Sequence, residues 1–440
     1  MENPQHVIIV LVDTTRRDSF GCYGATRPVT PRMDAIAAEG VRFDNAIAQS
    51  SWTLPTVTTI LTGTYPSIHG AEGKFTGEAN TSFHRSRDEI AHGPELLSGH
   101  GFKTHGIVNA GFLDPVLGIE RGFMVYDYFP SYNWRVRRAD KSVDAALEFF
   151  QKNQRKNTFT FLHLFDPHLN YDPPGEFREM FSKGYTGPFR TLTGPQIQKL
   201  IAEKWTPEVE GRNYLRGEYD AEILFMDREI GRLVDGLRAL ALYDRTMLII
   251  VADHGEEFWD HGGFEHGHTM YEELIRVALI VKLPSRYEPV RSVVLARVCQ
   301  VDIMPTVFDV LGLEPPATFD GESLLPVMID EATPKDRPAY SEGTLYGVDK
   351  VAFYQNRYKY ILDLGGGDGE LYDVIDDPLE TDNLAASQPD IALRMRAALE
   401  AFRSKLQDRM AQLSPARRVD MQAEQNRQLK DQLEALGYLR

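Results

Sequence analysis

Four side chains in this sequence could together hold a metal ion and attack an ester. Asp13 and the dipeptide Asp253-His254 each follow an apolar run, and Thr53 precedes a Leu-Pro step that opens a predicted helix. Two carboxylates and one imidazole suit Zn²⁺ or Mn²⁺, while Mg²⁺ or Ca²⁺ is less expected with a histidine ligand. A hydroxyl coordinated to such an ion becomes a nucleophile because its pKa falls. We therefore predict one divalent ion on Asp13, Thr53, Asp253 and His254.

Thr53 also has a simpler interpretation. Thr is a favoured N-cap residue, and Pro is favoured just inside a helix. The N–H groups at a helix start attract anions, so a phosphate or sulfate would rest at the same place. We expect Thr53 to cap the helix and to lie beside a bound anion.

Three histidines and one asparagine could complete the chemistry. An ester cleaved near pH 7 needs a proton donor for its leaving oxygen, and imidazole titrates in that range. We expect His268 or His168 to supply this proton, His266 to contact the substrate, and Asn109 to hold a non-bridging oxygen. A solvated loop or a strand-end turn is an equally good interpretation of each. Whether His266 joins His268 at a second metal stays open.

Strands and helices must bring these residues together. Several apolar runs end at the polar residues named above, and such runs are typical of strands buried on both faces of an α/β sheet. Ligands gather beyond the carboxyl ends of parallel strands, so these side chains would share one sheet edge. The predicted strands are 7–12, 104–108, 158–165 and 247–252, with helices over 142–151 and 219–242.

The sequence divides into a large domain and a smaller one. We predict a catalytic α/β domain over 1–336 and a smaller C-terminal domain over 337–440. Residues 169–215 are rich in Pro, Gly and charge, which fits a lid over the site or a plain surface insertion.

Within the smaller domain, residues 350–374 predict a β-hairpin whose turn is the glycine-rich segment 365–369. Two charged amphipathic helices follow, over about 388–412 and 417–437. They would pack on the smaller domain or form a dimer arm, so the sequence is compatible with a homo-oligomer.

Composition limits the partners. The 440 residues carry a net charge of −16, which argues against nucleic acid as a partner and makes capture of an anionic substrate depend on a bound cation. The two cysteines, Cys22 and Cys299, are too few for a disulfide framework or a thiolate cluster. The apolar run 7–12 lacks a preceding basic segment and is too short for a signal peptide or a membrane span. We predict a cytoplasmic protein with no membrane partner.

Several segments resemble motifs of the sulfatase family within the alkaline-phosphatase superfamily: 12–24, 29–37, 219–223, 252–256, 267–277 and 370–384. The resemblance implies a large mixed β-sheet sandwiched by helices, a smaller C-terminal α+β domain with an antiparallel sheet, and one metal-centred ester-cleaving site. Carried over by motif, Asp13, Asp253 and His254 would bind the metal. His168 and His268 would contact the substrate or its leaving group.

The sequence also departs from that family's pattern. Family sulfatases carry Cys or Ser, converted to formylglycine, at the position of Thr53, and an Arg at the position of Val57. Thr14 stands where many relatives have a second acidic residue, and Gly267 lies near the position of a lysine. Threonine nucleophiles are those of phosphodiesterase, nucleotide-pyrophosphatase and phosphoethanolamine-transferase relatives.

These observations predict a metal-dependent hydrolase of a small anionic ester. The expected substrates are phosphate diesters, phosphate monoesters or phosphonate esters, cleaved through Thr53 and a phospho-threonine intermediate. The alternatives are a sulfuric ester hydrolase that works without formylglycine, a phosphoryl transferase, and a catalytically silent binding protein on the same scaffold.

Overall fold

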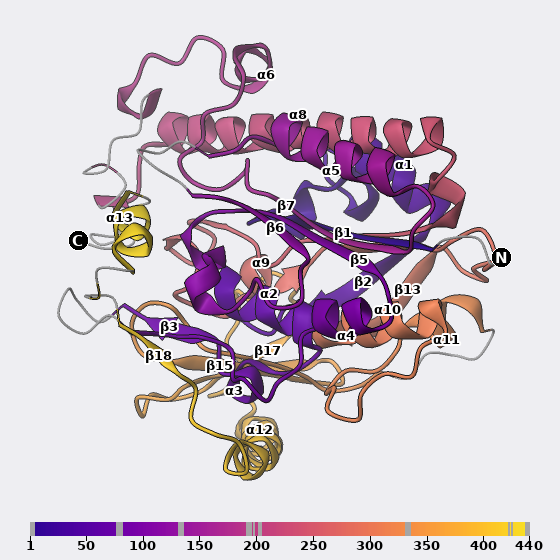
Figure 1. Cartoon of the computed structure of the whole chain (residues 1–440). Coiled ribbons are helices and arrows are strands. Elements are labelled where there is room, and N and C mark those ends of the chain that lie inside the picture. Colours follow the sequence, from indigo (N-terminus) through magenta and orange to yellow (C-terminus); the bar gives the residue numbers. More distant parts are fainter. Residues whose placement is uncertain are drawn as a thin grey trace.

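The computed structural model describes residues 5–75, 82–130, 136–190, 196, 199–200, 205–330, 336–420, 423 and 426–435. Helices cover both faces of a large mixed sheet, and a second, antiparallel sheet lies beyond one helical layer (Figure 1). This arrangement confirms the fold class expected from the sequence.

The centre of the large sheet consists of the four predicted strands, paired in parallel in the order β8-β1-β7-β5. Val12 is in register with Leu164 and Leu11 with Val251, so the residues that follow emerge along one edge. Every residue of β1, β7 and β8 is buried, as continuous apolar runs require. The bounds are β1 (His6–Val12), β5 (Lys103–Asn109), β7 (Thr158–Leu164) and β8 (Thr246–Val251).

The flanking strands were not predicted. They are short or only partly buried, so they lack the long apolar runs that identify the central strands. β12 runs antiparallel to β8 and to β2, which makes the sheet mixed. Their bounds are β2 (Val41–Ile47), β6 (Val125–Phe129), β11 (Arg276–Val277), β12 (Leu279–Lys282) and β13 (Val293–Cys299).

Helices α1, α5 and α8 cover one face of this sheet, and α2, α4 and α10 cover the other (Figure 1). The predicted helix at 142–151 is confirmed as α5. The helix predicted from 219 starts earlier, at Val209, and Tyr214 and Leu215 are already buried on it. The bounds are α1 (Pro31–Glu39), α2 (Thr53–Thr62), α4 (Gly93–Gly99), α5 (Ala139–Asn153), α8 (Val209–Ala239) and α10 (Ile303–Leu311).

Short elements connect these layers. They are the helices α3 (Pro66–His69), α9 (Glu272–Ile275) and α11 (Leu325–Ile329), the 3₁₀ turn η3 (Gly111–Leu113), the strands β3 (Glu72–Lys74) and β4 (Ser82–His84), and the hairpin β9 (Glu257–Phe258) with β10 (Phe264–Glu265).

The predicted excursion at 169–215 is wrong at its end, because α8 already starts at Val209. It contains α6 (Gly175–Phe181), which packs on α8 on the side away from the sheet (Figure 1). Arg178 of α6 donates to Glu218 of α8 over 2.7 Å. Residues 191–195, 197–198 and 201–204 lie outside the described residues, and a lid role for this segment stays a prediction.

The second sheet is four-stranded and antiparallel, in chain order. The predicted hairpin with a glycine-rich turn is confirmed as β16–β17, but 350–364 is itself a hairpin that turns at Asn356, where φ is 52°. Asparagine tolerates the left-handed conformation, so this turn contains no glycine and the search for glycine-rich turns did not reveal it. The bounds are β14 (Ala339–Glu342), β15 (Lys350–Gln355), β16 (Tyr358–Asp363) and β17 (Glu370–Asp373).

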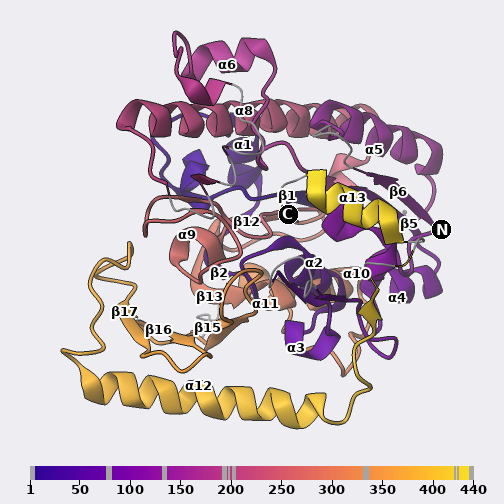
Figure 2. The ribbon, with the colours of Figure 1, turned by 90° about the vertical axis from the view of Figure 1, so that its left-hand side faces the viewer.

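The predicted helix at 388–412 is confirmed as α12 (Pro389–Met410), which lies along the smaller sheet (Figure 2). Its Phe402 packs against the rings of Tyr65, Tyr340 and Phe353. This helix therefore packs on the smaller domain, as one of the two interpretations expected.

The tail after α12 returns to the large domain. β18 (Arg418–Val419) pairs with β4, and α13 (Arg427–Ala435) packs through Leu429 and Leu433 beside Gly111. Figure 2 shows α13 apart from α12 and the smaller sheet. The prediction of one helix over 417–437 is wrong at its start, and its packing on the smaller domain is wrong too. Residues 436 and 437 lie outside the described part. Because β-pairing partners are distant in sequence, local periodicity could not reveal this return.

A buried ionic cluster joins the two sheets. Lys359 of β16 is fully buried, with its Nζ 2.8 Å from Glu380 Oε1 and 3.3 Å from Glu272 Oε1. Glu272 belongs to α9 of the large domain, so this contact crosses from one sheet region to the other.

We expect Lys359→Met to destabilise the protein by about 3–5 kcal/mol, because it removes the counter-charge beside the buried carboxylate of Glu380 and leaves Glu272 with Arg276 alone. The free energy of unfolding, from denaturant titration, measures this. Lys350→Met is the matched control on β15, since its partly exposed pair with Asp363 contributes about 1 kcal/mol or less. Equal effects of the two changes would contradict a structural role for the cluster.

Among the described residues, no helix is both long and apolar enough to cross a membrane. Cys22 and Cys299 are free thiols.

Candidate active site

Three of the predicted metal ligands meet at the carboxyl edge of the large sheet. Asp13 follows β1, and Asp253 and His254 follow β8; one donor atom from each lies within 4.8 Å of the others, and all three residues are buried. Asp13 Oδ1 is a buried oxygen without a hydrogen-bond partner among the described residues, and the buried Asp253 Oδ2 lies 3.2 Å from His254 Nε2. Bare buried carboxylate oxygens beside an imidazole fit a divalent cation.

The charges in this cluster compete for one proton. Burial and the carboxylate of Asp253 raise the pKa of Asp13 well above its usual range. Burial opposes ionisation of Asp253 as well, but the charge and hydrogen bonds of His254 outweigh it and hold the pKa of Asp253 at about 2. Burial also lowers the pKa of His254, yet the carboxylates of Asp253 and Asp13 raise it to about 9. A bound cation would balance these carboxylates instead of a proton.

Thr53 lies beside these ligands, with its Oγ1 3.2 Å from His254 Nε2. Its predicted role as an N-cap is wrong. Trp52 is the cap residue, and its side chain makes no capping bond, so Thr53 is the first residue of α2. A capping hydroxyl would be bonded to the backbone, whereas the Thr53 hydroxyl lies beside His254.

The loop that carries Asp13 is held in an uncommon conformation. Thr14 has a φ of 49°, in the left-handed region, and its N–H donates to Asp253 Oδ1 over 3.1 Å. Tyr219 of α8 fixes this turn, since its hydroxyl donates to Thr14 O and accepts from Arg16 N. Strain held in this way is typical of functional sites.

Arg16 braces the same loop. Its guanidinium donates to the carbonyl of Glu256 and to the carboxylates of Asp18 and Asp260. On the other side, Gln300 Nε2 donates to Asp253 O over 2.7 Å. The ligand loops are therefore fixed from both sides by buried polar side chains.

His163 is a functional residue that sequence reasoning missed. It is buried within β7, its Nε2 is 2.7 Å from Asp13 Oδ2, and its Nδ1 accepts the N–H of Asn109. Burial lowers the pKa of His163 to about 4, so the neutral ring donates from Nε2 and holds one oxygen of Asp13. The available signal was a single imidazole inside an otherwise apolar strand.

We expect His163→Leu to weaken metal affinity by about 10–100-fold, because it frees the orientation of Asp13. His163→Gln should recover part of this affinity, since an amide can still donate toward Asp13. Calorimetric titration of the metal-free protein measures it. His105→Leu, at another buried histidine of the sheet, is the control. Unchanged affinity in a folded His163→Leu variant would contradict the assignment.

The remaining predicted site residues fall into two groups. His266 is fully buried, its ring centroid lies 4.3 Å from that of His254 and 5.2 Å from that of His168, and Asn109 donates to His163 O. These three residues belong to the surroundings of the cluster. His268 is partly exposed, and its Nε2 is 2.6 Å from Glu257 Oε2 rather than bonded to a ligand.

The two acid candidates have different surroundings. Burial and the neighbouring His266 lower the pKa of His168 to about 3, and its Nδ1 donates to Leu169 O, which leaves Nε2 as an acceptor. A neutral His168 with this tautomer suits a base better than an acid. The pKa of Glu257 is lowered: burial raises it, but the hydrogen bond and charge of His268 outweigh that effect. The ionised Glu257 orients His268.

Two family profiles match this chain. The Sulfatase family profile matches residues 5–313, and the profile "N-sulphoglucosamine sulphohydrolase, C-terminal" matches residues 259–407.

Relatives are similar over most of the chain. An N-acetylglucosamine-6-O-sulfatase of Bacteroides thetaiotaomicron is 25% identical over 86% of this chain and 82% of its own. A solved structure of a protein with its substrate D-glucosamine-2-N,6-O-disulfate superimposes with a TM-score of 0.77 at 22% identity, covering 92% of this chain and 99% of the other. The phosphonate monoester hydrolase of Agrobacterium radiobacter gives 0.73 at 18% identity, covering 91% and 96%.

Proposed function

Because the chain belongs to the sulfatase family and is an ester-cleaving hydrolase, we propose that it cleaves phosphate or phosphonate esters with Thr53 as the nucleophile. The observation that carries the proposal is the position of Thr53 Oγ1, buried at the start of α2 and 3.2 Å from His254 Nε2. Sulfatase-family enzymes are metal-dependent, and Asp13, Asp253 and His254 would hold the ion.

When bound, the ion lowers the pKa of the Thr53 hydroxyl and neutralises charge on the ester. Thr53 loses its hydroxyl proton to solvent and attacks phosphorus, the bond from phosphorus to the leaving oxygen breaks, and phospho-threonine forms. The N–H groups at the start of α2, which receive no side-chain cap, would stabilise the developing charge. His268, oriented by Glu257, gives its proton to the leaving oxygen, and the neutral His168 accepts a proton from the water that cleaves the adduct.

The threonine favours phosphorus over sulfur. A formylglycine site releases sulfate by collapse of a hydrate, whereas an adduct on Thr53 has to be attacked directly. Phosphoryl adducts permit such attack more readily than sulfuryl adducts do.

A sulfuric ester hydrolase that works without formylglycine is the second candidate, since most of the relatives are named sulfatases. Transfer of the phosphoryl group to an alcohol is the third. The identity of the ion, the cytoplasmic location and a homo-oligomeric state stay predictions.

Parallel assays on the metal-loaded protein separate these candidates. Aryl phosphate monoester, aryl phosphate diester, aryl phosphonate and aryl sulfate are compared, each with and without an added alcohol. We expect kcat/KM for at least one phosphorus ester to exceed that for the sulfate by tenfold or more, with water as the acceptor. A preference for the sulfate would favour the sulfuric ester hydrolase over the proposal. Alkyl phosphate products would favour the phosphoryl transferase. If the metal-loaded, folded protein turns over none of these esters, the catalytically silent binding protein is the remaining interpretation.

A further inference from the structure

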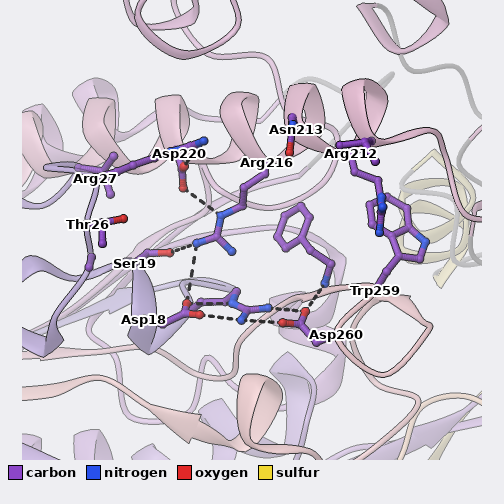
Figure 3. Close-up of a pocket in the computed structure, with 15 residues that line it drawn as sticks. Asp18, Ser19, Thr26, Arg27, Arg212, Asn213, Arg216, Asp220, Trp259 and Asp260 are labelled. Atoms are coloured by element: carbon purple, nitrogen blue, oxygen red, sulfur yellow. Dashed lines mark hydrogen bonds and ion pairs between the residues drawn. The ribbon is translucent and has the colours of Figure 1, made fainter. Parts of the chain in front are cut away.

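A polar cleft lies beside the ligand loop and takes no part in the chemistry described above. Its volume is about 570 Å³, within the range of cavities that bind small molecules. Its walls come from the loop after β1, the first turns of α8 and the β9–β10 hairpin (Figure 3).

The cleft lies near the predicted metal ligands. Arg16, which lines it, follows Asp13 by three residues on the same loop. An extended chain spans about 3.5 Å per residue, so the backbones of Arg16 and Asp13 are at most about 11 Å apart. Arg16 Nη1 also donates to the carbonyl of Glu256, two residues beyond His254, over 3.0 Å. A substrate bound at the ligands could extend into the cleft.

The lining of the cleft is locally basic. Four arginines and three aspartates line it, which gives +4 − 3 = +1, whereas the whole chain has a net charge of −16. Each aspartate is already engaged: Arg16 binds Asp18 and Asp260, and Asp220 accepts from Arg27 and Arg216. The existing ion pairs therefore leave a surplus of positive charge.

Arg212 provides that surplus. It is half-buried in the wall of the cleft, and among the described residues its guanidinium makes no hydrogen bond or ion pair, unlike that of Arg216 one turn later (Figure 3). A second unused donor is the indole N–H of Trp259, a lining residue that is 9% exposed and whose Nε1 has no partner among the described residues. Phe258 adds an apolar surface beside these donors.

We propose that this cleft binds a second anionic group of the ester substrate, a carboxylate, sulfate or phosphate, with Arg212 as its counter-charge. The substrate would then carry two anionic groups: the ester that is cleaved at Thr53 and another one farther along. This inference rests on the proposed function, because it assumes that the ester is bound at Asp13, Asp253 and His254. A guanidinium matches the planar or tetrahedral oxyanions named here.

Bidentate ligands test this directly. Alkane-α,ω-bisphosphonates with spacers of increasing length are titrated calorimetrically into the metal-loaded protein, beside alkyl monophosphonates of the same lengths. If one phosphonate sits at the metal and the other on Arg212, a matching spacer binds at least tenfold more tightly than its monophosphonate. ω-Carboxy and ω-sulfo alkylphosphonates show which second anion is preferred.

Variants assign the effect to the cleft. Arg212→Gln should abolish the tenfold advantage without changing monophosphonate affinity, and Asn213→Asp, an exposed change on the same wall, should reduce it. Arg228→Gln, on the same helix but paired with Glu176, should retain it. An absent advantage at every length, or one that survives Arg212→Gln, would overturn the proposal.

Failure of this inference and failure of the proposed function are distinguishable. Monophosphonate binding and aryl ester turnover report on the metal centre alone, and the bisphosphonate advantage reports on the cleft. Turnover without the advantage overturns the inference only. The advantage without turnover supports the cleft and overturns the proposed function.

Discussion

Thr53→Ala is expected to lower kcat/KM for an aryl phosphorus ester by about 10⁴-fold or more, because it removes the atom that attacks phosphorus. Thr53 Oγ1 makes its hydrogen bond to His254 rather than to the backbone of α2, so the variant should fold, and saturating metal offsets the loss of the Thr53 oxygen as a ligand. Steady-state kinetics on metal-saturated protein, with circular dichroism as the folding check, measure this.

Two further variants locate the effect. Thr53→Ser keeps a hydroxyl and should retain turnover within about 100-fold. Thr58→Ala, on the same helix, removes a hydroxyl that is bonded only to Leu54 O among the described residues, and it should change kcat/KM by less than about threefold. A Thr53→Ala variant as active as Thr58→Ala would exclude Thr53 as the nucleophile.

The second large effect is expected at Asp253. Asp253→Asn removes one carboxylate from the cluster, and we expect a loss of about 100-fold or more in metal affinity and about 10³-fold in kcat/KM at fixed metal concentration. Thermal unfolding provides a readout independent of activity. Metal at about 1,000 times the natural Kd stabilises the natural protein by about 4 kcal/mol, and the variant by about 1.4 kcal/mol if its Kd is 100-fold weaker.

Asp235→Asn is the matched control for this experiment. Asp235 is an exposed residue of α8 that pairs with Arg32, and its change should leave metal affinity unaltered. Equal metal-induced stabilisation of the natural protein and of Asp253→Asn would contradict the assignment of Asp253 as a ligand.

Sequence patterns predicted the elements that have long apolar runs or helical periodicity. The central strands are buried on both faces, so their apolar runs and polar ends located them and predicted that Asp13, Asp253 and His254 would converge. The partly buried flanking strands, and the return of β18 to β4, depend on pairing between distant segments. No local pattern contains that information.

The site shows the same division. Ligand types and spacing identified the cluster, but the roles of its neighbours depend on three-dimensional contacts. His163 had no motif around it, and its role follows only from its distance to Asp13. Thr53 has the sequence context of a helix cap, yet the helix begins one residue earlier than a cap at that position requires. The direction of its hydroxyl could not be inferred from the residue type.

In the proposed mechanism, Thr53 carries the phosphoryl or phosphonyl group of the substrate as a covalent adduct. The most direct test is to mix metal-loaded protein with an aryl phosphorus ester, quench within the turnover time, and map the adduct by mass spectrometry. We predict a phosphoryl or phosphonyl group on Thr53. The Thr53→Ala variant should show neither this adduct nor turnover. An adduct on another residue, or full turnover by Thr53→Ala, would contradict the account.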